Sequence, residues 1–238
     1  MTAWDGVNAQ LVVADIPFGR KFTGKASNYN RNADLVVDGY VEWNVEDYAD
    51  RVTDLMDTID RNLSDTGSAL VVSGWQHSRI VHELLEAYPA FDVQGKYYWA
   101  YNFAPYCKKR PAHNVYEIFW VTRKKHTWTF TNTCATTHCT DGEANLSVLT
   151  FKRDYKRGMP KYPTRLPLRL LQCLIQHHTR PGDLVLDPLA GSGMTGIAAQ
   201  SIGRDVLLGD LNTNGKRVFE SLLGFYQLSP TLQSQEAA

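Results

Sequence analysis

The sequence of 238 residues predicts an α/β fold in which a mostly parallel, twisted sheet has helices on both faces and an antiparallel hairpin at its edge. Strand-like and helix-like patterns of apolar residues alternate along most of the chain, and no internal repeat replaces them. The length suits one α/β domain with a small insertion and is short for two ordinary domains. We therefore expect a single domain over residues 1–238.

The first part of the chain predicts two strand–helix units. Residues 11–14 form an apolar run that ends at Asp15, and residues 68–73 form a second run, as buried strands do. Asn44, with Asp47 three residues later, predicts the start of a helix between them. The apolar face of that helix consists of Val52, Leu55, Met56, Ile59 and Leu63. The face of the next helix consists of Ile80, Val81, Leu84 and Leu85.

The middle of the chain predicts a hairpin followed by an irregular segment. Residues 97–103 and 115–122 are aromatic-rich strands joined by a basic loop, which indicates an antiparallel pair at the sheet edge. Residues 123–160 are rich in Thr, Asn, Cys and charge, with little periodicity. We expect an inserted recognition segment there.

The last part of the chain returns to alternating elements. Thr164 is the expected N-cap of a helix with the apolar face Leu168, Leu171, Leu174 and Ile175. A turn at Pro181-Gly182 follows. The remaining pattern predicts a strand at 184–187, a helix at 195–201, a strand at 206–210 and a final helix from about Asn214.

The net charge is zero, but the charges are unevenly distributed. Residues 1–103 carry 8 Lys and Arg against 15 Asp and Glu, residues 104–172 carry 13 against 4, and residues 173–238 carry 4 against 6. A basic segment interleaved with aromatic residues is typical of a surface that neutralises nucleic-acid phosphates, and a solvated basic face is the alternative interpretation. The candidate nucleic-acid-binding residues are Lys108, Lys109, Arg110, Lys124, Lys125, Lys152, Arg153, Lys156 and Arg157.

Composition disfavours a membrane, secreted or metal-binding protein. No apolar run approaches the ~20 residues that span a bilayer, and the first strand begins near Leu11, so we expect no membrane partner and no signal peptide. The 4 cysteines lack the spacing of a disulfide framework, which favours a reducing compartment. Cys134, His138 and Cys139 lack the spacing of a known zinc finger, and we therefore predict no metal site.

A glycine-rich loop follows the strand at 184–187. Gly191, Gly193 and Gly196 fit the GxGxxG pattern, and Asp210 ends the next strand. Such a loop exposes backbone N–H groups to a phosphate or a carboxylate, and the aspartate suits ribose hydroxyls, so the pattern alone indicates an adenosine cofactor. A dinucleotide enzyme normally begins with this unit, whereas only 28 residues follow Asp210. A P-loop is excluded because the GK[ST] ending is absent.

Motifs at both ends of the chain resemble those of DNA amino-methyltransferases. Residues 187–193 read Asp-Pro-Leu-Ala-Gly-Ser-Gly and precede Ala198-Ala199, Gly203-Arg204 and Leu208-Gly209-Asp210, which is similar to the family's DPFxGSGTT, AA, GR and IGxD/E. Residues 162–167, Tyr-Pro-Thr-Arg-Leu-Pro, resemble its HPTQKP-like motif. Asp15-Ile16-Pro17-Phe18 resembles its catalytic DPPY or SPPY. Residues 101–105 and 117–120 resemble the strand pair before its recognition region, and the tetrapeptide-first order is that of the permuted β group.

The resemblance implies a Rossmann-like methyltransferase fold with S-adenosylmethionine as cofactor. The cofactor-binding residues that it implies are Asp187, Pro188, Ala190, Gly191, Ser192, Gly193, Thr195, Asp210, Asn212, Pro163 and Thr164.

The implied catalytic residues are Asp15, Ile16, Pro17 and Phe18. The Asp15 carboxylate and the Ile16 carbonyl would accept the two N–H groups of an exocyclic amine, whose lone pair is otherwise delocalised into the base. Pro17 fixes its own φ and favours an extended Ile16. Phe18 offers a flat apolar face to a base flipped out of the duplex.

Four positions depart from the family pattern. Ile16 replaces the first proline and Phe18 the commoner tyrosine, while Leu189 and Met194 replace Phe and Thr. RNA adenine dimethyltransferases have NIPY-like or NLPF-like tetrapeptides, so an RNA substrate stays open.

The implied reaction is methylation of an exocyclic amine in double-stranded DNA. Asp15 favours adenine N6, because members acting on cytosine N4 more often begin with serine. Cytosine N4, an RNA target and an inactive cofactor- or DNA-binding module are the alternatives. No Pro-Cys dipeptide occurs, which disfavours methylation at a cytosine carbon. Candidate protein partners are a second copy of the chain and a cognate restriction endonuclease, in the cytoplasm of a prokaryotic cell or a viral host cell.

Overall fold

The computed structural model describes residues 4–19, 42–101, 108–109, 111–131, 146–154, 156–160, 162 and 164–229. Several sequence-based predictions therefore lie outside the described residues. They concern Arg110, Pro163, the Cys134–His138–Cys139 group and residues 132–145 of the expected recognition segment.

Within the described part of the chain, seven strands form one mixed sheet in the order β5-β3-β4-β2-β1-β6-β7. The strands are β1 (Ala9–Asp15), β2 (Leu63–Ser73), β3 (Phe91–Ala100), β4 (Val115–Arg123), β5 (Val148–Thr150), β6 (Leu184–Asp187) and β7 (Asp205–Leu208). β4 is antiparallel to both of its neighbours, and every other pairing is parallel. The carboxyl ends of the other six strands therefore meet at one edge of the sheet, here called the carboxyl edge.

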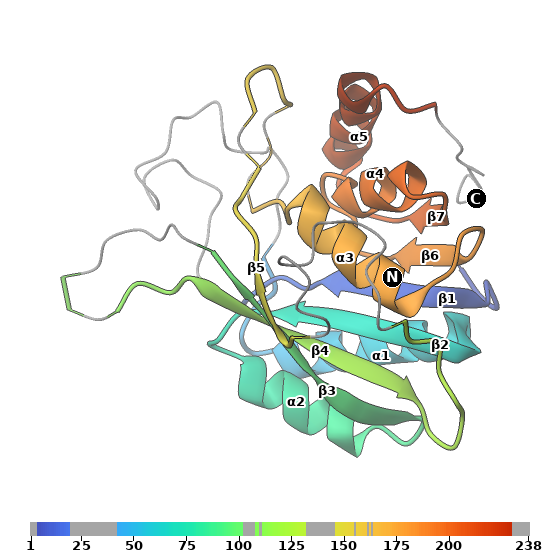
Figure 1. Cartoon of the computed structure of the whole chain (residues 1–238). Helices are drawn as coiled ribbons and strands as arrows, with labels where there is room; N and C mark the ends of the chain where they lie inside the picture. The colour runs from blue at the N-terminus through green and yellow to red at the C-terminus, as the bar shows by residue number, and fades with distance from the viewer. Residues whose placement is uncertain are drawn as a thin grey trace.

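Helices cover both faces of the sheet (Figure 1). They are α1 (Tyr48–Asn62), α2 (Ser78–Ala87), α3 (Leu168–His178), α4 (Met194–Ser201) and α5 (Thr213–Tyr226). Side chains alternate along β1: Leu11 and Val13 pack in the core shared with α3, α4 and α5, while Val12 and Ala14 pack in the core shared with α1 and α2. Because both faces are covered, β1 reads as a continuous apolar run. The predicted α/β class is confirmed.

The hairpin of β3 and β4 is antiparallel as predicted, but it does not form the edge of the sheet. β5 pairs with the outer side of β3, with Tyr98 opposite Val148 and Ala100 opposite Thr150. The three-residue β5 lies inside the segment 123–160, which was expected to be irregular, and is too short to show a strand period. β3 also begins earlier than predicted, because a register shift between Val93 and Gly95 breaks its alternation.

The predicted starts of α1 and α3 are wrong. α1 begins at Tyr48, and Asp47, rather than Asn44, occupies the N-cap position without a side-chain cap hydrogen bond. α3 begins at Leu168 after Pro167, well beyond Thr164. Proline disfavours helical geometry in the residue before it, so the helix cannot extend back to Thr164. The Leu168 N–H instead donates to Asp154 Oδ2 at 2.7 Å, a cap from a distant segment.

None of the helices in the described residues is both long and apolar enough to cross a membrane.

Candidate active site

A cavity of about 350 Å³ opens at the carboxyl edge, where β1 and β6 end side by side. The tetrapeptide Asp15–Phe18 lines one wall and the glycine-rich loop after β6 lines another, although more than 160 residues separate them. Of the predicted cofactor residues, those lining the cavity are Thr164, Asp187, Ala190, Gly191, Ser192, Thr195, Asp210 and Asn212. Pro188 and Gly193 lie in the same loop but do not line the cavity.

Asp187 fixes the glycine-rich loop from within. It is buried at the end of β6, where Oδ1 accepts a hydrogen bond from the Leu189 N–H at 3.0 Å and Oδ2 accepts one from the Thr195 hydroxyl at 2.6 Å. Burial raises the pKa of Asp187 to about 7, and the two hydrogen bonds act in the opposite direction. Both carboxylate oxygens are thus used to join the end of β6 to the first turn of α4.

Glycine is required at three places around this loop, two within it and one in α5, which packs against it. A Cβ on Gly193, which has φ 75°, would lie 2.5 Å from the Phe219 ring. A Cβ on Gly215 in α5 would lie 2.2 Å from the Gly191 carbonyl oxygen, and Gly191 itself has a φ of 51°. The loop is therefore packed closely against α5 beside the N-terminus of α4. A Cβ on Gly191 would lie 3.2 Å from the hydroxyl of Tyr162, which also lines the cavity, so glycine at this place keeps the cavity open, and this part of the loop is here called the glycine cradle.

Asp210 holds the opposite side of this cradle. Its Oδ2 accepts a hydrogen bond from the Gly191 N–H and its Oδ1 accepts one from the Asn212 N–H, both at 2.7 Å. Each carboxylate oxygen has a second lone pair for a ligand hydroxyl. Asn212 also caps α5, because its Oδ1 accepts a hydrogen bond from the Asn214 N–H at 2.9 Å.

The tetrapeptide is held by contacts along its backbone. The Ile16 N–H donates to the Val72 carbonyl of β2 at 3.2 Å, and the Ile16 side chain is buried in the core with α1. The Tyr48 hydroxyl donates to the Pro17 carbonyl at 3.1 Å, and the Gly19 N–H donates to Glu42 Oε1 at 2.9 Å. An apolar Ile16 therefore suits a position that faces the core.

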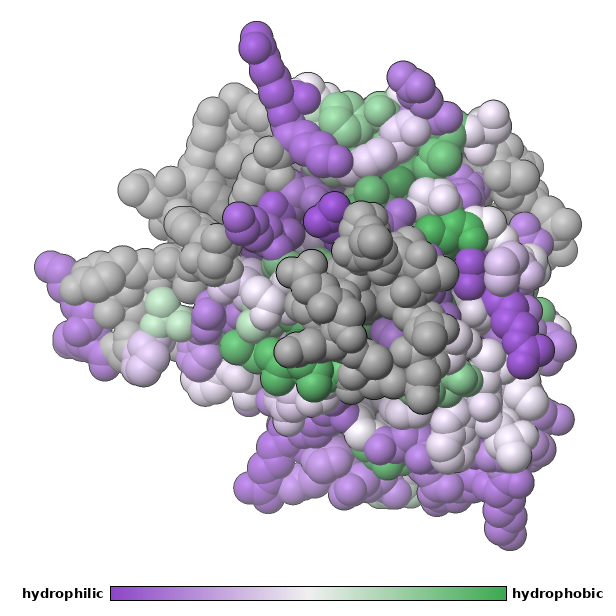
Figure 2. All heavy atoms as spheres, viewed as in Figure 1, coloured by the Kyte–Doolittle hydropathy of each residue, from purple (hydrophilic) through white to green (hydrophobic). Residues whose placement is uncertain are grey.

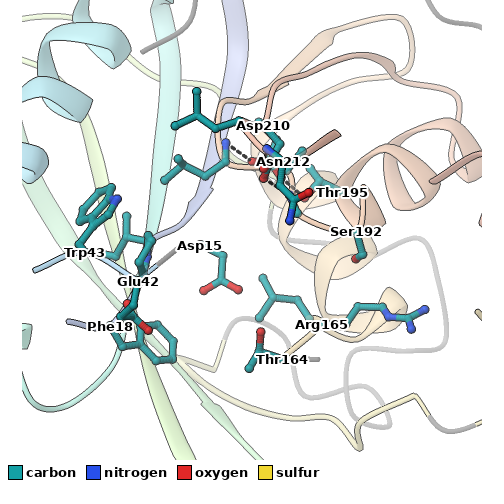
Figure 3. Close-up of a pocket in the computed structure, with 18 of the residues that line it drawn as sticks. Asp15, Phe18, Glu42, Trp43, Thr164, Arg165, Ser192, Thr195, Asp210 and Asn212 are labelled. Carbon is teal, nitrogen blue, oxygen red and sulfur yellow. Dashed lines mark hydrogen bonds between the residues drawn. The ribbon is translucent and has the colours of Figure 1, made fainter. Parts of the chain in front are cut away.

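Asp15 presents its carboxylate to the cavity, between Phe18 and Glu42 on one side and Ser192 and Thr195 on the other (Figure 3). Its Oδ1 is buried and has no hydrogen-bond partner among the described residues. Burial raises the pKa of Asp15 to about 8, with further contributions from the negative charges of Asp187 and Glu42, while Arg153 lowers it. An acceptor that the fold leaves unpaired in this way suits an N–H donor brought by a ligand.

Phe18 is half-buried beside an aromatic cluster. Its ring lies 5.1 Å from the Tyr116 ring, and a Cβ on Gly74 would lie 3.0 Å from its Cγ. The Arg153 guanidinium lies 4.9 Å from the Trp99 ring centre and 4.7 Å from the Tyr101 ring centre, and it donates to the Tyr116 hydroxyl at 3.1 Å. Arg153, one of the candidate phosphate-binding residues, is thus packed behind the tetrapeptide by cation–π contacts.

The other basic residues divide between the two edges of the sheet. Lys108 and Lys109 are exposed in the connection between β3 and β4, and Lys152, Lys156 and Arg157 are exposed after β5, so both groups follow strands that end at the carboxyl edge. In Figure 2, hydrophilic side chains project around this connection and around the loop after β5. Lys124 and Lys125 follow β4 and therefore lie at the opposite edge, where the Lys124 ammonium donates to the Tyr88 carbonyl.

The cavity is also lined by residues outside the predicted site, and three of them, Leu211, Arg165 and Glu42, carry chemistry that a ligand could use. Leu211 directly follows Asp210 and is 94% exposed. Arg165 donates to the Pro160 carbonyl through Nη2, while its buried Nη1 has no hydrogen-bond partner among the described residues. Glu42 comes from the segment before α1. Arg165 belongs to the motif at residues 162–167, so its sequence position could have indicated a place in the cavity. Glu42 belongs to no motif that we identified.

The described residues contain no group of three His, Cys, Asp or Glu side chains that could hold a metal ion.

The glycine-rich loop and the Asp210 carboxylate, which suits ribose hydroxyls, lie together at the carboxyl edge of a sheet with helices on both faces. This arrangement is typical of α/β proteins that bind an adenosine cofactor. Residues 9–221 match the family model of DNA methylases of the N6/N4 type, and the chain belongs to this family.

Individual relatives are distant. The chain is 21% identical over 233 residues to the DNA adenine methyltransferase YhdJ of Escherichia coli (strain K12), an alignment that covers 87% of this chain and 73% of the relative. It is 27% identical over 218 residues to the Type II methyltransferase M.HinfI of Haemophilus influenzae, covering 83% of this chain and 58% of that protein.

Solved structures share the fold. M1.HpyAVI in its SAM complex has a TM-score of 0.68 at 19% identity, covering 91% of this chain and 89% of that chain. The cytosine-N4-specific PvuII DNA methyltransferase has a TM-score of 0.69 at 17% identity, covering 97% of this chain and 83% of that chain.

Proposed function

We propose that this protein transfers a methyl group from S-adenosylmethionine to an exocyclic amine of a DNA base, and that adenine N6 is the acceptor. The observation that carries the proposal is the buried, unpaired Asp15 oxygen, which lies in the same cavity as the glycine cradle. Membership of the DNA methylase family supports the same reaction.

The residues of the cavity fit the cofactor. Asp210 has acceptor capacity left for two ribose hydroxyls, and the exposed Leu211 offers an apolar face for an adenine ring. The narrow backbone cradle at Gly191 suits the methionine portion, because a Cβ at this place would obstruct it. The buried Arg165 Nη1 is a donor suited to the methionine carboxylate. When bound, S-adenosylmethionine supplies a methyl group on a positively charged sulfur.

The tetrapeptide residues would position and activate the amine. Asp15, as a carboxylate, accepts one N–H of the base and the Ile16 carbonyl accepts the other, which turns the nitrogen lone pair away from the ring. Phe18 stacks on the flipped base, and the contacts of Gly74 and Tyr116 keep its ring in place. Asp15 also takes up the proton that the nitrogen loses on methylation.

The adenine preference rests on residue type and on a relative. Asp15 occupies the position where cytosine-N4 enzymes more often have serine, and YhdJ is named an adenine methyltransferase. The resemblance of the fold to a cytosine-N4-specific enzyme supports cytosine N4 as the second candidate.

We place sequence recognition within residues 123–160, inside a single catalytic domain, and assign it to the part from β5 onward, because the Lys124 and Thr129 N–H groups donate to Ala90 and Thr66 at the opposite edge of the sheet. β5 belongs to this segment, and the chain leaves β5 at the carboxyl edge toward Lys152 and Arg153. The similarity to M.HinfI, a Type II methyltransferase, supports a role in a restriction–modification system.

Labelled S-adenosylmethionine and bacterial DNA, followed by mass analysis of the nucleosides, test the proposed function. We expect label in N6-methyladenine. Label in N4-methylcytosine would overturn the adenine preference alone, whereas label confined to RNA, or no label in any nucleic acid, would overturn the DNA methyltransferase proposal.

The variant Asp15→Ala tests the assigned acceptor. Transfer should fall by roughly 100-fold or more, as for loss of a preorganised transition-state group, because the amine loses its carboxylate partner. The affinity for S-adenosylmethionine, measured by calorimetry, should stay nearly unchanged. Equal transfer by the variant and the wild type would show that the tetrapeptide is misassigned.

A further inference from the structure

Trp75 is an exposed aromatic residue next to the cavity. The residue is 44% exposed and lies two positions after the end of β2 at Ser73. Trp128 is similarly exposed, at 40%, but lies at the opposite edge of the sheet, because the neighbouring Thr129 N–H donates to the Thr66 carbonyl near the start of β2. Exposed large aromatic side chains often mark binding surfaces. Of the exposed large aromatic side chains in the described part of the chain, which are Trp75, Trp128 and Phe130, that of Trp75 lies at the carboxyl edge.

The backbone places Trp75 at the rim of the base-binding wall. Gly74, the residue before it, packs against the Phe18 ring so closely that a Cβ would lie 3.0 Å from Cγ. Phe18 is the residue expected to stack on the flipped base. Trp75 therefore lies one residue from the backbone that supports this stacking face.

The Trp75 ring is held in place by a partner from another connection. It stacks on the His113 ring with centres 4.3 Å apart and planes 13° apart. The His113 carbonyl accepts a hydrogen bond from the Tyr101 hydroxyl at 3.1 Å, and Asn114 Nδ2 donates to the Tyr101 carbonyl at 3.0 Å. The connection after β2 and the connection between β3 and β4 thus meet in one stacked pair, here called the Trp75–His113 pair.

Positive charge lies in the same connection. Lys108 and Lys109 are exposed between β3 and β4, a few residues before His113. Lysines contribute affinity for phosphates without regard to sequence, and an aromatic ring stacks on any base because every base has a π-face. Aromatic rings near cationic side chains are the combination expected at a surface that binds nucleic-acid phosphates and stacks on unpaired bases.

We propose that the Trp75–His113 pair inserts into duplex DNA beside the target base and stacks on the bases that flank the vacated position. This inference rests on the proposed function, because it assigns a role in the extrusion of the target base. Extrusion costs the stacking and pairing of one base, and an aromatic side chain that replaces this stacking favours the flipped state. The Trp75 ring already stacks on His113 in the absence of DNA, and such a preformed contact lowers the entropy cost of ordering the ring on insertion.

The test compares Trp75→Ala and Trp75→Phe with Trp128→Ala, an exposed tryptophan at the opposite edge. Single-turnover methylation is measured on a 30-base-pair duplex that contains a site mapped from the wild-type product. A second duplex carries an abasic residue opposite the target base, which removes the pairing cost of extrusion.

Trp75→Ala should slow methylation of the paired duplex by roughly tenfold, within the range of one base-stacking contact, and should slow methylation of the abasic duplex less than about threefold. Trp75→Phe should keep most of the rate, and Trp128→Ala should match the wild type on both duplexes. An equal loss on both duplexes, or no loss on either, would overturn the proposal.

Tryptophan fluorescence separates this proposal from the proposed function, because it requires no methyl transfer. A duplex with one central abasic gap should quench the fluorescence of the wild type and of Trp128→Ala, and should quench that of Trp75→Ala far less. Quenching without methylation would refute the proposed function and retain the stacking site. The same quenching in all three proteins would refute the stacking site.

Discussion

At the scale of single residues, the fold places Asp15 in an environment that disfavours its charged carboxylate form. Its Oδ1 is buried without a hydrogen-bond partner among the described residues, and the negative charges of Asp187 and Glu42 add to the effect of burial on its pKa. Arg153 is the positive charge that acts against them, and the rings of Trp99, Tyr101 and Tyr116 hold its guanidinium in place. Unfavourable burial of a group that a ligand will satisfy is typical of active sites.

This electrostatic arrangement predicts the pH dependence of methyl transfer. Asp15 accepts an N–H only as a carboxylate, so kcat/KM should rise with pH and level off above about 8, the pKa of Asp15 in the free protein. Tyr162, whose pKa burial raises to about 12, stays neutral throughout this range.

Arg153 variants supply the control for this profile. Arg153→Met removes the charge that lowers the pKa of Asp15, so the rise in kcat/KM should move to higher pH. Arg153→Lys retains the charge and should keep the profile close to that of the wild type. A profile that does not move in Arg153→Met would assign the titration to another group.

At the scale of elements, local pattern predicted which segments are helices and strands better than where they begin. The apolar faces of α1, α2 and α3 and the runs of β1 and β6 are visible in sequence because burial imposes their periods. The start of α3 is not visible, since its first N–H group, that of Leu168, is satisfied by Asp154, 14 residues earlier in the chain. β5 is specified by its pairing with β3 and not by its three residues.

The cap of α3 can be tested by stability. Asp154→Ala should lower the free energy of unfolding by about 1 kcal/mol, a typical cost of a lost cap, because the Leu168 N–H loses its acceptor. Asp154→Asn retains an oxygen acceptor and should cost only a few tenths of this amount. Thermal unfolding would detect a decrease in Tm of about 2–4 °C for the alanine variant, and equal Tm values for all three proteins would contradict the assigned cap.

At the scale of the whole molecule, strand direction decides which basic residues share a surface with the cavity. Lys108 and Lys109 lie in the connection that leaves β3 at the carboxyl edge, whereas Lys124 and Lys125 follow the antiparallel β4 and lie at the other edge. The sequence places all four residues in one basic segment and does not distinguish the two pairs.

The two lysine pairs offer matched variants for DNA binding. Replacing Lys108 and Lys109 with Ala should weaken DNA binding and reduce the slope of log K against log salt by about 2, near 0.9 for each phosphate contact. Replacing Lys124 and Lys125 should leave the slope unchanged. The slopes come from fluorescence anisotropy at several salt concentrations, and a loss of slope in the second pair alone would place DNA on the opposite edge.

The sequence by itself determined the class of fold and marked the glycine-rich loop and the tetrapeptide as candidate sites, because backbone geometry at Gly191 and Gly193 and burial along β1 restrict residue types locally. Tertiary structure alone decided that Asp15 faces the glycine cradle, that Arg153 packs behind it and that Trp75 meets His113 at the rim. Those relations depend on the order and direction of strands distant in the chain, and no local pattern of residues specifies them.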